Sequence, residues 1–295
     1  MASALGLGGW DGPLAGRIAI PVAADRTPDV TTRLAVTVGR QAGLGLEFVD
    51  AAAPAHRDER ARALRRRCAA AVAGGASCVG WEVVDGGARD VGPYITWSGA
   101  ALRCIGTDGH RRSTSRAVTG GCAVPLLVAG PRWRPPPLDG YRHLVVGLDG
   151  DSWHNEPIAT CAMDLARWID ADITLVGVVA PGPGFADVVA SAHLHWIAAG
   201  LDHPPLFETV SARDPATVLA GLLDDSSLLV VGAPCHHRSI LGGLAGSLVR
   251  RVPFPILVVP VTSPRGCCRS VVVRPGGDRR YAMMVAARGG DDHDR

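Results

Sequence analysis

The chain contains an internal repeat with a spacing of 126 residues. The stretch RIAIPVAAD (17–25) has a counterpart in HLVVGLDGD (143–151), and LRCIGTDG (102–109) has one in LLVVGAPC (228–235). The glycines that follow are also spaced alike, because 14 residues separate the two members of each pair: Gly106 and Gly120, Gly232 and Gly246. Matching strands, loops and glycines predict two copies of one folding unit.

A proline-rich segment, PRWRPPPLDG (131–140), joins the two copies. It can form neither a regular helix nor a central strand, so it reads as a linker. We therefore expect one domain at 13–131 and a second at 139–261. Residues 262–295 are rich in Gly, Arg and Asp without sustained periodicity, which predicts a mostly disordered tail.

In the second copy, continuous apolar runs alternate with amphipathic stretches. RHLVVGLD (142–149) is typical of a strand buried on both faces of a parallel sheet. A helix is expected at 155–170, with Asn155 as its cap and Pro157 in its first turn. The remaining expected elements are strands at 172–179, 205–210, 227–233 and 255–260 and helices at 184–200 and 214–225. This alternation predicts a doubly wound α/β fold with a parallel sheet.

The first copy shows the same series less clearly. The expected elements are helices at 27–43 and at 57 to about 73, and strands at 17–25, 44–51, 78–86, from 102, and at 124–131. A stretch interrupted by Gly and Pro lies before residue 102, which predicts a short or broken helix there.

Composition and charge exclude several classes of protein. Apolar residues make up 47% of the chain, charged residues 20%, and the net charge is only +2 with scattered basic residues, so no nucleic-acid footprint is present. The densest basic run (57–68) also carries acids and predicts a solvated helix face. No apolar segment reaches the length of a membrane span. The eight cysteines form no CxxC pair and no signal peptide is evident, which predicts reduced thiols in the cytoplasm.

The residues at two strand ends predict a binding site in the second copy. Ligands of open parallel sheets bind beyond the carboxyl ends of the strands. Asp149 ends the first strand there, and the loop GAPCHHRSILGGLAGS (232–247) leaves a later strand. Glycine amides and a helix N-terminus expected at Gly246–Ser247 suit a phosphate, and an acid suits a ribose, a base edge or Mg²⁺. These are the parts of an adenine-nucleotide site, although a structural connection without a ligand is the other interpretation.

Other chemistry in this loop is less well supported. Cys235, His236 and His237 include adjacent histidines whose side chains point apart, and no second ligand cluster is near in sequence, so we expect no metal site. Ser239 and Ser247 lack the G-x-S-x-G context of a hydrolase nucleophile. The sequence therefore predicts a protein that is not an enzyme, with slow ATP hydrolysis as the most that a bound nucleotide would undergo.

On three motifs the chain resembles the universal stress protein family in its tandem form. The motifs are VVGLDGD (145–151), the glycine loop (232–247) and VPFPILVVP (252–260). The resemblance covers nearly all of 142–260 and, more weakly, 17–131. It implies two Rossmann-like or flavodoxin-like domains, each with a five-stranded parallel sheet, that pair through their last strands as a pseudo-dimer. It also implies ATP, with or without Mg²⁺, a possible homodimer, and these binding positions: Asp149, Val178, Gly232, Gly246, Ser247 and Leu248.

The chain departs from the family pattern in both copies. Cys235 stands at the second glycine of the loop motif, and the stretch to Gly246 is one residue longer. A Cβ at position 235 crowds a phosphate if the backbone there needs positive φ. The first copy keeps Gly106, Gly109 and Gly120 but has Ala23 in place of Asp149 and Gly121 in place of Ser247. We therefore expect the first domain to be degenerate and empty.

Three functions are compatible with the sequence. The favoured hypothesis is a regulatory, universal-stress-type protein that binds an adenine nucleotide in the second domain. The alternative is an interaction scaffold of the same fold with no ligand. The third, a nucleotide-dependent transferase, is disfavoured because no further catalytic motif is found.

Overall fold

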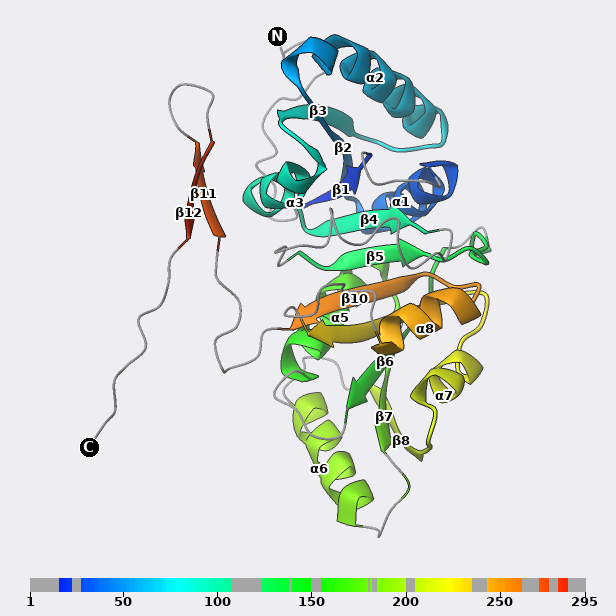
Figure 1. Cartoon of the computed structure of the whole chain (residues 1–295). Helices are drawn as coiled ribbons and strands as arrows, with labels where there is room; N and C mark the ends of the chain where they lie inside the picture. The colour runs from blue at the N-terminus through cyan, green and yellow to red at the C-terminus, as the bar shows by residue number, and fades with distance from the viewer. Residues whose placement is uncertain are drawn as a thin grey trace, which may run out of the picture.

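The computed structural model contains one ten-stranded sheet with helices on both faces (Figure 1). It describes residues 16–22, 28–107, 124–137, 140–149, 155–179, 181, 185–199, 205–234, 243–261, 271–275 and 281–285. The strand order in this sheet is β3-β2-β1-β4-β5-β10-β9-β6-β7-β8. Each half of the chain therefore contributes five consecutive strands, as the repeat predicts.

The ten strands fall into two series of the same order. The first is β1 (Arg17–Pro21), β2 (Gly45–Ala52), β3 (Val79–Asp85), β4 (Leu102–Gly106) and β5 (Leu126–Ala129). The second is β6 (His143–Asp149), β7 (Asp172–Val179), β8 (Leu206–Ser211), β9 (Ser227–Pro234) and β10 (Ile256–Val261). Neighbours within each series are parallel. The two series meet where β5 and β10 pair antiparallel, with Leu257 opposite Leu127, so the expected pairing through the last strands is confirmed.

The helices separate into two layers. One face of the sheet is covered by α1 (Pro28–Ala42), α2 (Arg57–Ala73), α5 (Asn155–Ile169) and α6 (Phe185–Ala199). The other is covered by α3 (Ala88–Trp97), α7 (Pro215–Gly221) and α8 (Gly243–Arg251). A short 3-10 turn, η2 (Pro54–His56), precedes α2. Among the described helices, none is long and apolar enough to cross a bilayer.

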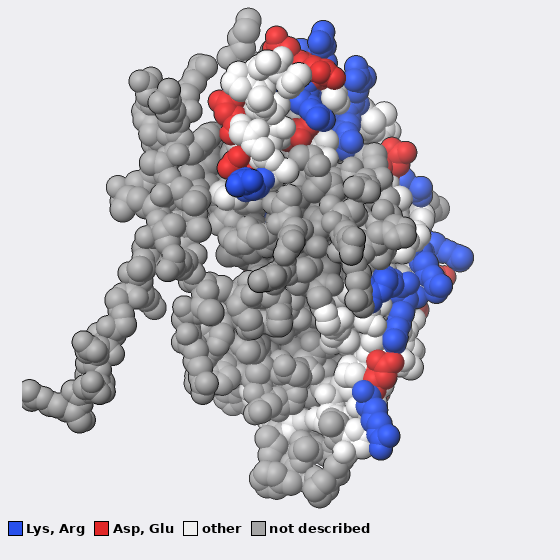
Figure 2. Space-filling view, viewed as in Figure 1, with Lys and Arg blue, Asp and Glu red and all other residues white. Residues whose placement is uncertain are grey.

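The basic run of the sequence forms α2, at the top of Figure 1. Leu64, Cys68 and Ala71 face the core, and most of the charged residues of this helix are exposed. Figure 2 shows acidic and basic side chains interspersed in the region of α2. This arrangement confirms the expected solvated face.

Helix α7 is shorter than the 214–225 expected from the apolar pattern, since it ends at Gly221. The Asp224 carboxylate accepts hydrogen bonds from the hydroxyls of Ser226 and Ser227 and from the Ser226 amide. Local side-chain bonding of this kind offers the backbone an alternative to the helix. It therefore closes a turn directly before β9.

Residues beyond β10 are described only at β11 (Val271–Pro275) and β12 (Tyr281–Val285), which pair antiparallel in a separate two-stranded sheet. Residues 262–270, 276–280 and 286–295 lie outside the described residues. The predicted tail at 262–295 and the two domain boundaries stay predictions.

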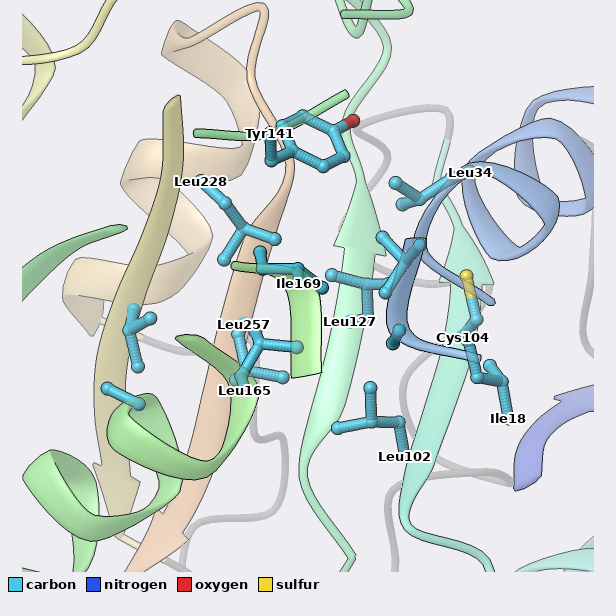
Figure 3. Packing of buried hydrophobic residues seen from close by; sticks show 14 of the residues in the cluster. Ile18, Leu34, Leu102, Cys104, Leu127, Tyr141, Leu165, Ile169, Leu228 and Leu257 are labelled. Carbon is cyan, nitrogen blue, oxygen red and sulfur yellow. The ribbon is translucent and has the colours of Figure 1, made fainter. Parts of the chain in front are cut away.

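The halves share one core, and hydrogen bonds of Gln41, here called the Gln41 clamp, also join them. Figure 3 shows apolar side chains from both halves, among them Leu127 and Leu257, in one continuous cluster. Beside it, Gln41 of α1 reaches into the second half: its Nε2 donates to the carbonyls of Tyr141 (2.5 Å) and Ile169 (2.7 Å). Its Oε1 accepts from the Tyr141 amide at 2.9 Å. One side chain thus satisfies three backbone groups of the second half.

A second polar contact ties α7 to α8. Asp214 caps α7 by accepting from the Ala216 amide (3.1 Å) and the Thr217 hydroxyl (2.7 Å), and it also accepts from Arg251 at the end of α8 (2.8 Å). The Arg251 and Thr217 hydrogen bonds lower the pKa of Asp214 from its ordinary value of 3.8 to about 2.

Replacement of Gln41 by Ala should destabilise the protein, because three backbone groups at the contact between the halves lose their partner. We expect a loss of about 2–3 kcal/mol in the free energy of unfolding, given the cost of leaving partly buried polar groups unsatisfied. Urea unfolding followed by circular dichroism measures it. The exposed neighbour Arg40, replaced by Ala, is the control; equal effects of the two changes would contradict the clamp.

Replacement of Asp214 by Ala should lower the melting temperature at pH 7 by about 2 °C, because the cap of α7 and its bond to α8 are both lost. The native pKa of Asp214 is depressed, so its contribution is present above pH 3.8 and is lost as the pH falls towards 2. The difference in melting temperature between wild type and variant should therefore shrink below about pH 4. A difference that is constant between pH 7 and pH 3 would refute the charge-dependent part; Asp225→Ala, at an exposed position, is the control.

Candidate functional site

The carboxyl ends of three neighbouring strands, β9, β6 and β7, meet at one edge of the sheet in the second half. Asp149, the last residue of β6, lies opposite Val178 of β7. On the other side of β6, Val231 lies opposite Gly147, which places Gly232 next along the same edge. The structure therefore brings together the three predicted strand-end positions: Asp149, Val178 and Gly232.

The side chains at this edge differ in what they offer a ligand. Val178 is half-buried and packs against the cluster beneath α7. The side chain of Asp149 lies outside the described residues. The backbone position of Asp149, at the end of the central strand of the three, is the part of the prediction that the structure describes.

Gly232 is explained by packing. A Cβ on this residue would collide with the Ile158 side chain of α5. Ile158 is itself buried at 4% exposure. The missing side chain therefore lets α5 lie close to β9, whether or not a phosphate binds beyond it. The sequence suggested a phosphate-facing glycine, and its spacing could not reveal this second role.

Helix α8 begins earlier than expected. The sequence placed the helix N-terminus at Gly246–Ser247, but the helix runs from Gly243, whose φ is +55°. A glycine accepts this left-handed backbone without strain, which allows the early start. The first four amides of a helix have no partner within it, so in α8 they belong to the residues from Gly243 to Gly246. The Gly246 amide remains available, whereas Ser247 can contribute its half-buried side chain.

Leu248 lies in the core. It is fully buried in the cluster that α8 shares with β9 and β10. Gly246 is also buried. Any contact of Gly246 with a ligand would therefore come from its backbone amide.

The middle of the glycine loop, 235–242, lies outside the described residues, and with it Cys235, His236, His237 and Ser239. The effect of Cys235 and of the extra loop residue on a phosphate thus stays a prediction. In the part of the chain that the structure describes, no group of three or more His, Cys, Asp or Glu side chains is placed to hold a metal.

The corresponding edge of the first half has different chemistry. Gly106 ends β4 as expected, while Ala23, Gly109, Gly120 and Gly121 lie outside the described residues. Near the carboxyl end of β2, Asp50 is 1% exposed. Its Oδ1 accepts from the Ala51 amide at 2.9 Å, and its Oδ2 lies 3.6 Å from an Arg60 nitrogen. The acid inside the apolar strand EFVDAA was the available signal for this pair, and our sequence interpretation missed it.

The first half also buries charge in the middle of its sheet. Arg103 on β4 is fully buried and donates to the Val124 carbonyl at 3.0 Å from one terminal nitrogen. Glu47 on β2 accepts from the Tyr94 hydroxyl (3.1 Å) and from Arg17 (3.3 Å). Burial, and next the charge of Glu47, raise the pKa of Tyr94 well above its usual range. The second half has Leu229 at the repeat position of Arg103, so the two copies have diverged inside the sheet as well as at its edge.

Replacement of Gly232 by Ala should cost about 1–2 kcal/mol of stability, because the new methyl group overpacks against Ile158. Shortening Ile158 to Val in the same chain should recover part of that loss. Urea unfolding of the single and double variants measures both, with Gly221→Ala as the control, since a Cβ at Gly221 meets no other atom. A loss that Ile158→Val does not reduce at all would contradict the packing explanation.

Sequence comparison identified no relative. No family model matches the chain, and no curated protein sequence matches it. Likeness to known proteins is therefore carried by the structure.

Solved structures resemble the molecule over most of its length. A universal stress protein from Archaeoglobus fulgidus matches with a TM-score of 0.60 at 12% identity, over 82% of this chain and 98% of that chain. A candidate universal stress protein from Pseudomonas aeruginosa matches with a TM-score of 0.55 at 14% identity, over 84% and 94%. The cytoplasmic domain of a prokaryotic cation chloride cotransporter matches with a TM-score of 0.54 at 11% identity, over 83% and 95%. Identities this low show similarity of fold alone. The molecule has the α/β fold of the universal stress proteins.

Proposed function

We propose that the protein is a regulatory, universal-stress-type protein that binds an adenine nucleotide at the carboxyl edge of β6, β7 and β9. The supporting observation is the convergence of Asp149, Val178 and Gly232 at that edge. Helix α8 follows the same β9 after the glycine loop and begins with amides that have no partner within the helix. An acid and a helix N-terminus at one sheet edge are the donors and acceptors that a ribose and a phosphate chain require.

The donor set fits a nucleotide better than it fits a metal alone. The α8 amides and the Ser247 hydroxyl donate hydrogen bonds, and they carry a positive dipole end that attracts phosphate. The described residues contain no cluster of three metal-ligating side chains. Mg²⁺ would therefore enter with the phosphates of ATP, held by them and by water, with Asp149 as the one protein carboxylate that the proposal assigns to it.

The role that we assign to this site is sensing. The proposed residues include no nucleophile paired with a base, so a bound nucleotide would be hydrolysed slowly if at all. The first half, with Ala23 at the place of the acid, serves as a fixed partner that completes the pseudo-dimer. The four cysteines at described positions are free thiols, which agrees with the reducing cytoplasm that we propose as its location.

Two observations favour the alternative, a scaffold without a ligand. Packing against Ile158 accounts for Gly232, and the core accounts for Leu248. Two of the six predicted binding positions thus have a structural reason of their own. The likeness to a transporter's cytoplasmic domain also shows that one fold occurs in proteins of different roles, so binding must be measured directly.

Calorimetric titration with ATP and with AMP tests the proposal. Wild type should bind saturably. Asp149→Ala should weaken binding roughly 10- to 100-fold, since a hydrogen bond to a charged group contributes more than a neutral one. Ser247→Ala should weaken it by less, about 2- to 10-fold.

The matched control is Asp172→Ala. This exposed carboxylate lies at the amino end of β7, at the opposite edge of the same sheet, so its loss should leave affinity unchanged. Absence of saturable binding by the wild type would overturn the nucleotide proposal and favour the scaffold. Equal affinities of the Asp149 variant, the Ser247 variant and the control would place the site elsewhere.

A further inference from the structure

An open groove lies where the first half meets α5. Its volume is about 480 Å³. Apolar side chains line most of it, with the carboxylates of Glu156 and Asp164 beside them; the apolar wall consists of Leu102, Pro125, Pro157, Cys161, Leu165 and Trp168. Neither the candidate nucleotide edge nor its residues belong to it. The groove therefore requires an explanation of its own.

The internal repeat gives this groove an equivalent position, which lies against α1 instead of α5. Helices α1 and α5 are each 15 residues long and start 127 positions apart. The amide of Arg103 donates to the Pro125 carbonyl, and that of Leu229 donates to the Pro255 carbonyl in the same way. Leu102 and Cys161, which line the groove, thus correspond to Leu228 and Leu34.

At the equivalent position on α1, the linker between the halves fills the groove. Figure 3 shows the Tyr141 ring between Leu34 and Leu228, and Tyr141 is only 1% exposed. Trp133 lies beside it, 8% exposed, and its indole nitrogen donates to the Tyr141 hydroxyl at 3.2 Å. The Arg33 guanidinium lies 5.7 Å from the centre of the Trp133 ring. Two aromatic side chains from the segment before β6 therefore fill the groove on α1.

The segment before β1 is the counterpart of that linker. It enters β1 at Gly16, where a Cβ would lie 2.8 Å from the Cβ of Ala101. Ala101 lines the open groove, and its amide donates to the Arg17 carbonyl at 3.0 Å. The repeat position of Tyr141 is Ala15, which is outside the described residues and has no ring to place in the groove.

We propose that the N-terminal segment, residues 1–15, occupies the groove on α5 through Trp10. Trp10 is the one aromatic residue of this segment. A chain covers at most about 20 Å from Gly16 to Trp10, and the lining part of α5 is about 18 Å long, so the indole reaches the wall between Pro157 and Trp168. Its N–H has an acceptor there in Asp164 or Glu156, as the Trp133 N–H has one in Tyr141. The groove on α5 and its equivalent on α1 would then each be filled by the segment that precedes the first strand of one half.

Site-specific crosslinking tests where Trp10 lies. The photoreactive aromatic residue p-benzoylphenylalanine replaces Trp10 in the full chain, and the crosslinked peptides are identified by mass spectrometry. We expect crosslinks within one molecule to the peptides that carry Leu102, Pro125 or 156–168. Crosslinks only to other peptides, or only between two molecules, would overturn the proposal; the latter would assign the groove to a second copy.

Hydrogen exchange provides an independent readout on an unlabelled protein. Trp10→Ala should raise amide exchange in α5 several-fold and leave α2, on the far side of the first half, unchanged. Ser3→Ala, in the same segment, is the control and should change neither helix. Unchanged exchange of α5 in a folded Trp10→Ala protein would contradict the proposal. Loss of the far-ultraviolet circular dichroism would show instead that the variant does not fold, and the crosslinking result then decides.

Discussion

The antiparallel pairing of β5 with β10 is the contact on which the rest of the molecule depends. Each half ends in a short apolar strand that would be an exposed edge if the half stood alone, and such edges are prone to uncontrolled association. Pairing Leu127 opposite Leu257 converts both edges into the centre of a ten-stranded sheet. It also brings α1 and α5 together over one apolar cluster, with Gln41 bridging them. The two halves consequently share a core.

The direction of the strands follows from that pairing. All strands within a half are parallel, so an antiparallel contact between the halves sends their carboxyl ends to opposite edges of the sheet. The molecule thus has two edges of the kind that bind ligands in parallel sheets, and they carry different residues. In the second half β6 ends at Asp149, whereas the first half has a buried Asp50 paired with Arg60. These differences support our proposal of a single nucleotide site, in the second half.

The sequence predicted the strands of each half and their assembly into a parallel sheet, because buried parallel strands are continuous apolar runs that differ sharply from the helices. The strand-end positions of the candidate site, Asp149 and Gly232, followed from the same runs.

Three features could not be predicted from the sequence. The start of α8 depends on the positive φ of Gly243, whereas the glycine pattern placed the helix N-terminus at Gly246–Ser247. The packing of Gly232 against Ile158 is a tertiary contact between residues far apart in the chain. The Gln41 clamp joins the two halves, and their relative placement cannot be predicted from local sequence patterns.

A crystal structure of the protein grown with ATP and Mg²⁺ is the most direct test of the proposed nucleotide site. We expect one nucleotide per chain at the carboxyl ends of β6 and β9, with a phosphate near the first turn of α8 and the ribose or base near Asp149. The edge formed by β1 and β4 should be empty. Nucleotide density at the first-half edge instead, or no density at either edge in crystals that hold ATP at saturating concentration, would contradict it.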